Sequence, residues 1–259
     1  MNTHEYSQVL RLRLLELARE TQRGVDYAIK AYKLGNTEFC MSVRDRTYDI
    51  DVLHGEITDL VRDLLAMELP GESNLRYILA SEQIANAMRL VHGHNVEIAT
   101  NSVRIVENGG GLGCAELCTM GDLVNSLVRL SVVALFEEDV EHAELVQRCS
   151  AVGRLFGSTF YDWYRTIDHT ARAQAEFERR ITKHLDQITR STHEIAGALV
   201  FWLECSDDRS EDQADEQVSI SDEAGATENP EAALVPDGMQ SFLRSIDSCF
   251  ADANFWSRL

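Results

Sequence analysis

The sequence predicts an all-α protein, built as two tandem three-helix bundles and followed by an acidic, largely disordered C-terminal tail. Three observations support this prediction. Apolar residues recur at spacings of three and four along most of the chain, as in amphipathic helices. Pro70 is the only proline in the first 229 residues, and a lone proline in a helical sequence marks a turn between two helices. The pattern of the first half also starts again in the second, as in an internal repeat.

The first half contains three helical patterns joined by short turns. The first ends at Gly35-Asn36, where a C-terminal glycine is followed by the N-cap of a second helix. The second ends at Pro70, and Gly71-Glu72-Ser73-Asn74 provides turn and N-cap residues for a third. Short connections make neighbouring helices antiparallel, so residues 1–107 are predicted to form the first three-helix bundle. Its predicted core positions are Leu10, Leu14, Leu17, Val25, Ala28, Tyr32, Ile50, Leu53, Ile57, Leu60, Val61, Leu64, Leu65, Leu75, Ile78, Leu79, Ala85, Met88, Val91 and Ile98.

A glycine-rich stretch, Glu107-Asn-Gly-Gly-Gly-Leu-Gly113, separates the two halves. A phosphate-binding loop would need a strand before these glycines and a Gly-Lys-Ser/Thr after them, and the sequence has neither. We therefore interpret residues 108–114 as a linker between two domains.

The helical pattern resumes over residues 115–205 and predicts a second three-helix bundle. Glu137-Glu138-Asp139 provides a turn and an N-cap within it. Glu97-Ile98-Ala99 in the first half has a counterpart in Glu194-Ile195-Ala196, which favours two copies of one unit. The predicted core positions are Leu117, Val124, Leu127, Leu130, Val133, Leu145, Val152, Phe156, Phe160, Trp163, Ile181, Leu185, Ile188, Ile195, Leu199 and Trp202.

The helical pattern is lost after this second unit. Residues 206–237 hold eleven acidic residues and one arginine, and such a segment buries too little apolar surface to fold by itself. We predict an acidic disordered linker there. Residues 238–259 regain amphipathic spacing and are predicted to be a short segment that docks either onto the bundles or onto a partner. Docking onto the bundles is the simpler interpretation.

The composition excludes several classes of protein. A net charge of −19 argues against nucleic acid and anionic membranes as partners. The sequence has no run of about 18 apolar residues and no signal-peptide pattern at its start, so we expect neither membrane insertion nor secretion. Its six cysteines are scattered, which favours a reduced, cytoplasmic protein. Cys114 and Cys118, one helical turn apart, are either metal ligands or two buried thiols, and we favour buried thiols.

Residues 5–106 resemble the first repeat of the PhoU family of phosphate-signalling proteins. The resemblance is carried by Ile50-Asp51-Val52-Leu53 in the second helix and by the corner Leu64-Leu65-Ala66-Met67-Glu68-Leu69-Pro70, followed by Asn74-Leu75-Arg76. In the third helix it is limited to Glu97-Ile98-Ala99. Residues 115–204 match the second repeat more loosely, through the phase of their helices and Glu194-Ile195-Ala196.

Members of that family often hold multinuclear metal clusters through a Glu-x-x-x-Asp motif in the third and sixth helices. Carboxylates four residues apart share a helix face and can bind one hard cation. The matching positions here are Arg89 and Gly93 in the third helix, and Asp186 and Arg190 in the sixth. The family's acidic position in the second helix is Thr47. We therefore expect the usual metal cluster to be lost, and we expect no cofactor.

Weaker candidates for metal binding remain. They are Asp51, His54, Glu97, Asp186 and Glu194. The first two place a carboxylate and an imidazole three residues apart, as do Asp139 and His142. His92 and His94 lie where the family motif is lost, but side chains two positions apart on a helix point away from each other. The Glu-x-x-His pairs of di-iron bundles are absent. We therefore favour solvent-exposed or capping roles for the histidines.

Sequence motifs favour a binding protein over an enzyme, because no nucleophile–base pair, nucleophile elbow, Walker motif or zinc spacing is present. The resemblance implies a cytoplasmic regulator of phosphate uptake and of the phosphate-starvation response. Such a protein is an adaptor between the ATPase subunit of a phosphate ABC transporter and a phosphate-sensing histidine kinase. The alternatives are an accessory regulator of another permease and a carboxylate-bridged metal-binding bundle. Homodimerisation is left open.

Overall fold

The computed structural model describes residues 3–67, 71–110, 113–151 and 172–211. These residues form helices and no strand. The helices are α1 (Thr3–Leu34), α2 (Thr37–Ala66), α3 (Glu72–Glu107), α4 (Ala115–Glu137) and α6 (Arg172–Glu211), with a further helical segment over residues 140–151. The predicted all-α fold is confirmed. Residues 212–259, with the predicted docking segment, and Pro70 lie outside the described residues.

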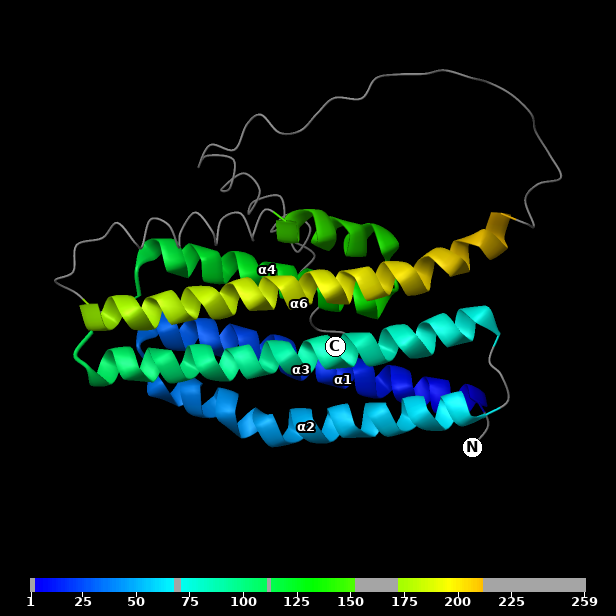
Figure 1. Cartoon of the computed structure of the whole chain (residues 1–259), viewed down its shortest axis with the longest axis horizontal. Helices are drawn as coiled ribbons and strands as arrows, with labels where there is room; N and C mark the ends of the chain where they lie inside the picture. Colours follow the sequence, from blue (N-terminus) through cyan, green and yellow to red (C-terminus); the bar gives the residue numbers. More distant parts are fainter. Residues whose placement is uncertain (1–2, 68–70, 111–112, 152–171, 212–259) are drawn as a thin grey trace, which may run out of the picture. The chain divides into compact units, whose positions relative to one another are not determined.

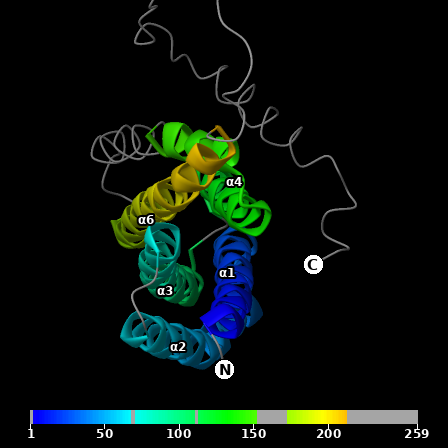
Figure 2. The same cartoon turned by 90° about the vertical axis from the view of Figure 1, so that its right-hand side faces the viewer.

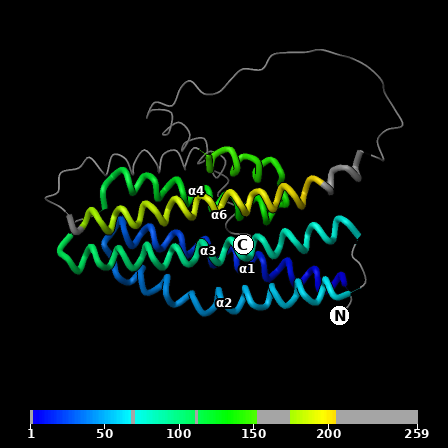
Figure 3. The backbone as a smooth tube through the Cα atoms, viewed as in Figure 1, coloured from blue at the N-terminus to red at the C-terminus, as the bar shows by residue number. Residues whose placement is uncertain are grey.

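The described helices pack around a shared interior. α1, α2 and α3 contact one another pairwise and make the first unit. α4 packs on α1, and α6 runs along α3 on the same side of this unit (Figures 1 and 2). The path of the chain in Figure 3 shows that α3 and α6 run in opposite directions. Two contacts between these helices support the antiparallel arrangement. Tyr77 of α3 contacts Trp202 of α6, and further along α3 His94 contacts His184, which comes earlier in α6.

The turns between helices follow the predicted local chemistry in two places. Gly35 has a positive φ of 59°, and the side chain of Asn36 accepts a hydrogen bond from the backbone N–H of Glu38 at 2.8 Å. Glu138 is left-handed at φ 54°, and Asp139 accepts from the backbone N–H of His142 at 3.1 Å. Both caps satisfy helix-end donors that would otherwise lack partners.

The start of α3 differs from the expectation. Its N-cap is Gly71, which makes no side-chain capping bond. Ser73 and Asn74, predicted as capping residues, lie inside the first turn of the helix. A glycine is an accepted N-cap because its backbone adopts the required angles without steric cost, so the helix starts earlier than the side-chain signal indicates.

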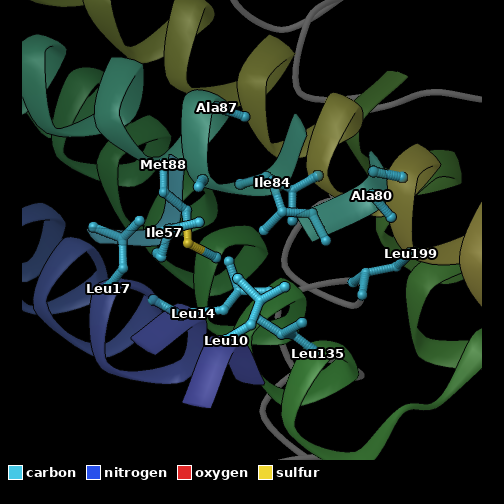
Figure 4. Close-up of a cluster of buried hydrophobic side chains, with 14 of the residues drawn as sticks. Leu10, Leu14, Leu17, Ile57, Ala80, Ile84, Ala87, Met88, Leu135 and Leu199 are labelled. Atoms are coloured by element: carbon cyan, nitrogen blue, oxygen red, sulfur yellow. The ribbon is translucent and has the colours of Figure 1, made fainter. Parts of the chain in front are cut away.

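The apolar stripes of the sequence form one continuous interior. Leu10, Leu14 and Leu17 of α1 belong to one buried cluster with residues of α2 and α3, and this cluster also includes Leu135 of α4 and Leu199 of α6 (Figure 4). Most predicted core positions among the described residues are buried, while Val152, Phe156, Phe160 and Trp163 lie outside the described residues. Leu65, Leu75 and Leu79 are exposed instead, near the corner between α2 and α3.

Contacts between its helices make Met1–Ser210 one compact unit. A second core cluster likewise combines Val25 of α1 and Val91 of α3 with Val124 of α4 and Ile188 of α6. Each half therefore completes the interior of the other. The boundaries predicted at residues 107 and 115 stay predictions.

α4 is long and apolar enough to cross a membrane, by length and composition only. The same composition is typical of a core helix, and 67% of its most apolar window is buried inside the protein. Leu117, Leu127 and Leu130 are buried, and α1 covers this helix. Burial by neighbouring helices accounts for its apolar character.

The predicted linker contains a packed junction. A Cβ atom at Gly113 would overlap the ring of Tyr32, so only glycine allows this close approach. The hydroxyl of Tyr32 donates to the buried carboxylate of Glu178 on α6 at 2.9 Å and accepts from the backbone N–H of Cys114 at 2.9 Å. Burial raises the pKa of Tyr32, of Cys114 and of the half-buried Cys118, so the phenol and both thiols stay protonated at neutral pH. Tyr32 therefore joins α1, α4 and α6.

Replacing Tyr32 by phenylalanine is expected to lower the free energy of unfolding by about 2 kcal/mol, because a buried hydrogen bond to a carboxylate is lost. Urea denaturation followed by circular dichroism measures this change. Tyr48→Phe is the matched control, since Tyr48 is 75% exposed, and its effect should stay within about 0.5 kcal/mol. Equal effects of the two substitutions would contradict the prediction.

Candidate functional site

The face between α2 and α3 carries the first predicted metal candidates. Asp51 accepts a hydrogen bond from Nε of Arg89 at 2.8 Å. Nε2 of His54 is 2.7 Å from Oδ1 of Asn86. Both candidates on α2 are thus held by side chains of α3. Arg89 stands at a position where the family motif has a carboxylate, so its positive charge faces the remaining acid.

The other three candidates lie apart from this face. Asp186 on α6 accepts from Nε of Arg190 at 3.0 Å, one helical turn away. Glu194 is exposed on the same helix. Glu97 is exposed on α3 and lies close enough to the imidazoles of His94 and His184 to influence their pKa values. The structure does not bring the five candidates together into one site.

A buried polar cluster fills the middle of the first unit. His92, 3% exposed, forms a hydrogen bond between its Nε2 and Oγ1 of Thr47 at 3.0 Å. Asn95 is fully buried, and neither polar atom of its amide has a hydrogen-bond partner among the described residues. A Cβ atom at Gly24 would lie 3.1 Å from Nδ2 of Asn95, so this glycine provides room for the amide.

The expected exposed or capping role is therefore wrong for His92. Burial lowers the pKa of His92 to about 4, although Asp51 opposes this shift and Arg46 adds to it. The imidazole is neutral at physiological pH and acts as a core hydrogen-bonding group. Sequence spacing missed it because a histidine between apolar neighbours gives no sign of whether a partner such as Thr47 lies opposite.

In the described part of the chain, one group of three side chains of metal-ligating type has its ligand atoms within 4.8 Å of one another. The three residues are Glu137, Asp139 and His142. Asp139 is the N-cap of the helical segment 140–151, and Nδ1 of His142 is 2.5 Å from its carboxylate. Partial burial acts to raise the pKa of Asp139, but the hydrogen bonds from His142 outweigh it and hold that pKa below its usual value. Helix capping by Asp139 explains this group without a metal, and the imidazole of His142 pairs with the capping carboxylate.

Replacing Asp139 by alanine is expected to cost about 1 kcal/mol of unfolding free energy, because the cap is lost. Asp139→Asn should cost much less, since an asparagine side chain also accepts from the helix N-terminus. Thermal unfolding of both variants at pH 7.5 measures the difference. An asparagine variant as unstable as the alanine variant would show that the carboxylate has another role.

A serine and a histidine also meet, on the helical segment 140–151 and α6. Oγ of Ser150 lies 2.9 Å from Nδ1 of His193 and donates to the backbone carbonyl of Gln147 at 2.9 Å. Ser150 is fully buried, so no substrate reaches its hydroxyl. The pair links two helices and lacks the access that a nucleophile needs.

A pocket of about 210 Å³ opens at the end of the bundle, where α1 and α3 begin. Its lining residues are His4, Ser7, Gln8, Arg11, Ser73, Asn74, Tyr77, Glu138 and Trp202. Nearby, Arg76 pairs with Glu72 at 3.1 Å and lies over the ring of Phe201 at 5.0 Å. The arginine of the predicted corner is thus engaged within the protein, by its own helix and by α6.

Comparison with known proteins agrees with this architecture. Residues 14–102 match the family model of the PhoU domain. The structure is similar to PhoU from Pseudomonas aeruginosa, with a TM-score of 0.75, 18% identity, and coverage of 79% of this chain and 100% of that one. It is also similar to the phosphate transport system regulatory protein PhoU from Streptococcus pneumoniae, with a TM-score of 0.70, 18% identity, and coverage of 79% and 98%. No curated protein sequence matches the chain significantly.

The two kinds of comparison support different statements. At 18% identity the solved structures establish the fold, whereas the domain match places the first three helices within the family. The domain match includes the residues that carry the resemblance, from Ile50-Asp51-Val52-Leu53 to Glu97-Ile98-Ala99. Residues 14–102 of this protein therefore match a PhoU domain, and the described chain has the fold of the PhoU structures.

Proposed function

We propose that the protein regulates phosphate transport by binding other proteins. The observation that carries this proposal is the fold match along the whole of the Pseudomonas aeruginosa PhoU chain. The Streptococcus pneumoniae relative is described as a phosphate transport system regulatory protein. A repeated helical scaffold with a buried, inaccessible serine–histidine pair suits protein binding better than catalysis.

In its specific form, the protein is a cytoplasmic adaptor between the ATPase subunit of a phosphate ABC transporter and a phosphate-sensing histidine kinase. It represses the phosphate-starvation response when phosphate is plentiful. Support comes from the PhoU-domain match over residues 14–102, because members of that family couple such a transporter to such a kinase. The adaptor needs no chemistry of its own, only helical surfaces that both partners recognise.

A second candidate is an accessory regulator of a different permease. It is favoured by the altered motif positions, where Arg89 pairs with Asp51, Arg190 pairs with Asp186, and Thr47 bonds to His92. Side chains that bind a metal in the family are here replaced by groups with partners inside the protein. A changed interior is compatible with a changed partner on the same fold.

The carboxylate-bridged metal bundle is the least favoured function. Asp51, His54 and Asp186 each engage a neighbouring protein side chain, and the five candidates are spread over two faces. A bridged cluster needs several carboxylates directed at one point.

Affinity capture of the tagged full-length protein from its own host tests the adaptor directly. Cells are grown at high and at low phosphate, and bound proteins are identified by mass spectrometry. The phosphate transporter ATPase or the sensor kinase is expected in the high-phosphate sample. An unrelated acidic protein with the same tag controls for capture by charge alone.

Deletion of the gene provides a second test of the proposed function. The deletion strain is expected to express a phosphate-starvation reporter in phosphate-rich medium, and the intact gene should restore repression. If the reporter is unchanged and another permease is captured at both phosphate levels, the second candidate replaces the first.

A further inference from the structure

Two histidines from different halves of the chain meet where α3 packs on α6. Nδ1 of His94 and Nδ1 of His184 are 3.2 Å apart, and the ring centroids are separated by 5.4 Å. Both side chains are half-buried. Burial lowers the pKa of each imidazole, so both are neutral at pH 7. The neutral ring is the form that binds transition metals.

The separation of the two nitrogens suits a single tetrahedral metal ion. Zinc–imidazole bonds are about 2.0–2.1 Å long, so two ligand nitrogens on one tetrahedral ion lie about 3.3 Å apart. The measured Nδ1–Nδ1 distance of 3.2 Å is therefore close to the metal-bound spacing.

A negative charge acts on this pair. Glu97 follows His94 by three positions on α3, so the two side chains share one face of the helix. Its negative charge acts on both imidazoles, raising the pKa of each against the effect of burial. Lys183, exposed on α6, is the positive charge that acts on both rings in the opposite direction. Glu97 is not part of the group of three ligand atoms found within 4.8 Å of one another in the described residues, so it favours a cation here through its charge. Water completes the coordination of an ion held by two imidazoles.

We propose that His94 and His184, with the nearby negative charge of Glu97 favouring a cation, bind Zn²⁺ or a similar divalent transition-metal ion that joins α3 to α6. The two histidines lie outside the positions of the family's carboxylate motif, which are Arg89, Gly93, Asp186 and Arg190 here. The site goes beyond the proposed regulatory function and does not depend on it. A metal at this point ties the helix that ends the first unit to the helix that ends the second.

Isothermal titration of the metal-free, full-length protein with Zn²⁺ at pH 7.5 tests the site, using a tag without histidines. The expected result is one equivalent of bound zinc. His94→Ala and His184→Ala should each weaken binding at least tenfold, and Glu97→Gln should weaken it by less than either. His142→Ala is the matched control. It removes the imidazole of the group Glu137, Asp139 and His142, and it is expected to leave zinc affinity unchanged.

A second measurement covers the case in which a histidine variant fails to fold, which circular dichroism reveals. In the wild-type protein, one equivalent of Zn²⁺ should shift the imidazole proton signals of two of the eight histidines. It should also raise the melting temperature, because an ion that binds only the folded state stabilises it. Unshifted histidine signals, or zinc binding that is lost in His142→Ala and kept in His94→Ala, would overturn the proposal.

Discussion

Replacing Leu14 by alanine is expected to lower the free energy of unfolding by about 3 kcal/mol, because removal of a buried leucine side chain leaves a cavity in a close-packed interior. Leu14 is 1% exposed and belongs to the core cluster in which helices of both halves meet (Figure 4). The loss should therefore affect the whole described unit in one transition. Urea denaturation followed at 222 nm measures it.

Leu12→Ala is the matched control, two residues away on the same helix. Leu12 is 66% exposed, so its replacement should change the free energy of unfolding by no more than about 0.5 kcal/mol. If the two variants were equally destabilised, the interior would not lie where the structure places it.

The stability of the protein is expected to fall as the pH drops from about 6.5 to about 4, and His92 should account for about 3 kcal/mol of this loss. An unfolded histidine titrates near pH 6.5, whereas burial lowers the pKa of His92 to about 4 in the folded protein. Above pH 6.5 neither state is protonated and the residue has no effect. Below it, the unfolded state takes up a proton that the folded state lacks, so unfolding becomes easier.

The substitution His92→Gln isolates this contribution, because glutamine can still form a hydrogen bond with Thr47 but does not titrate. Denaturation midpoints of wild type and variant are compared at pH 7.5, 5.5 and 4.5. The difference at pH 7.5 reports the packing change alone, and the wild-type advantage should shrink as the pH falls. His94 and His184, whose pKa values are also lowered by burial, add to the loss in both proteins. Parallel pH curves for the two proteins would contradict the assignment.

At positions where the family's carboxylates are missing, the residues present here have partners inside the protein. Thr47 and His92 form one internal pair, and Arg89 and Asp51 form another. Each replacement is matched by a neighbour of suitable chemistry, as in a protein that keeps its fold while its interior interactions change. This is why the proposed function rests on binding surfaces and not on the family's metal chemistry.

The candidate site was predicted less completely than the fold. The spacing of His92 and His94 correctly implied that the two rings point apart, since His92 reaches Thr47 on α2 and His94 reaches His184 on α6. Their partners could not be predicted, because they lie 45 and 90 residues away in the chain. The five metal candidates were chosen by local spacing and by resemblance, and packing directed three of them, Asp51, His54 and Asp186, to separate neighbours.

The sequence by itself determined the helices and most of their ends, because these depend on local physics. Apolar spacing sets the buried stripe of each helix, and residues such as Gly35, Asn36 and Asp139 end or start helices through their own backbone and side-chain preferences. Tertiary structure alone decided that α4 and α6 complete the core of the first unit, that Tyr32 reaches Glu178, and that His94 meets His184. These contacts depend on how helices distant in sequence rotate and pack, and a periodic stripe does not specify which partner it will face.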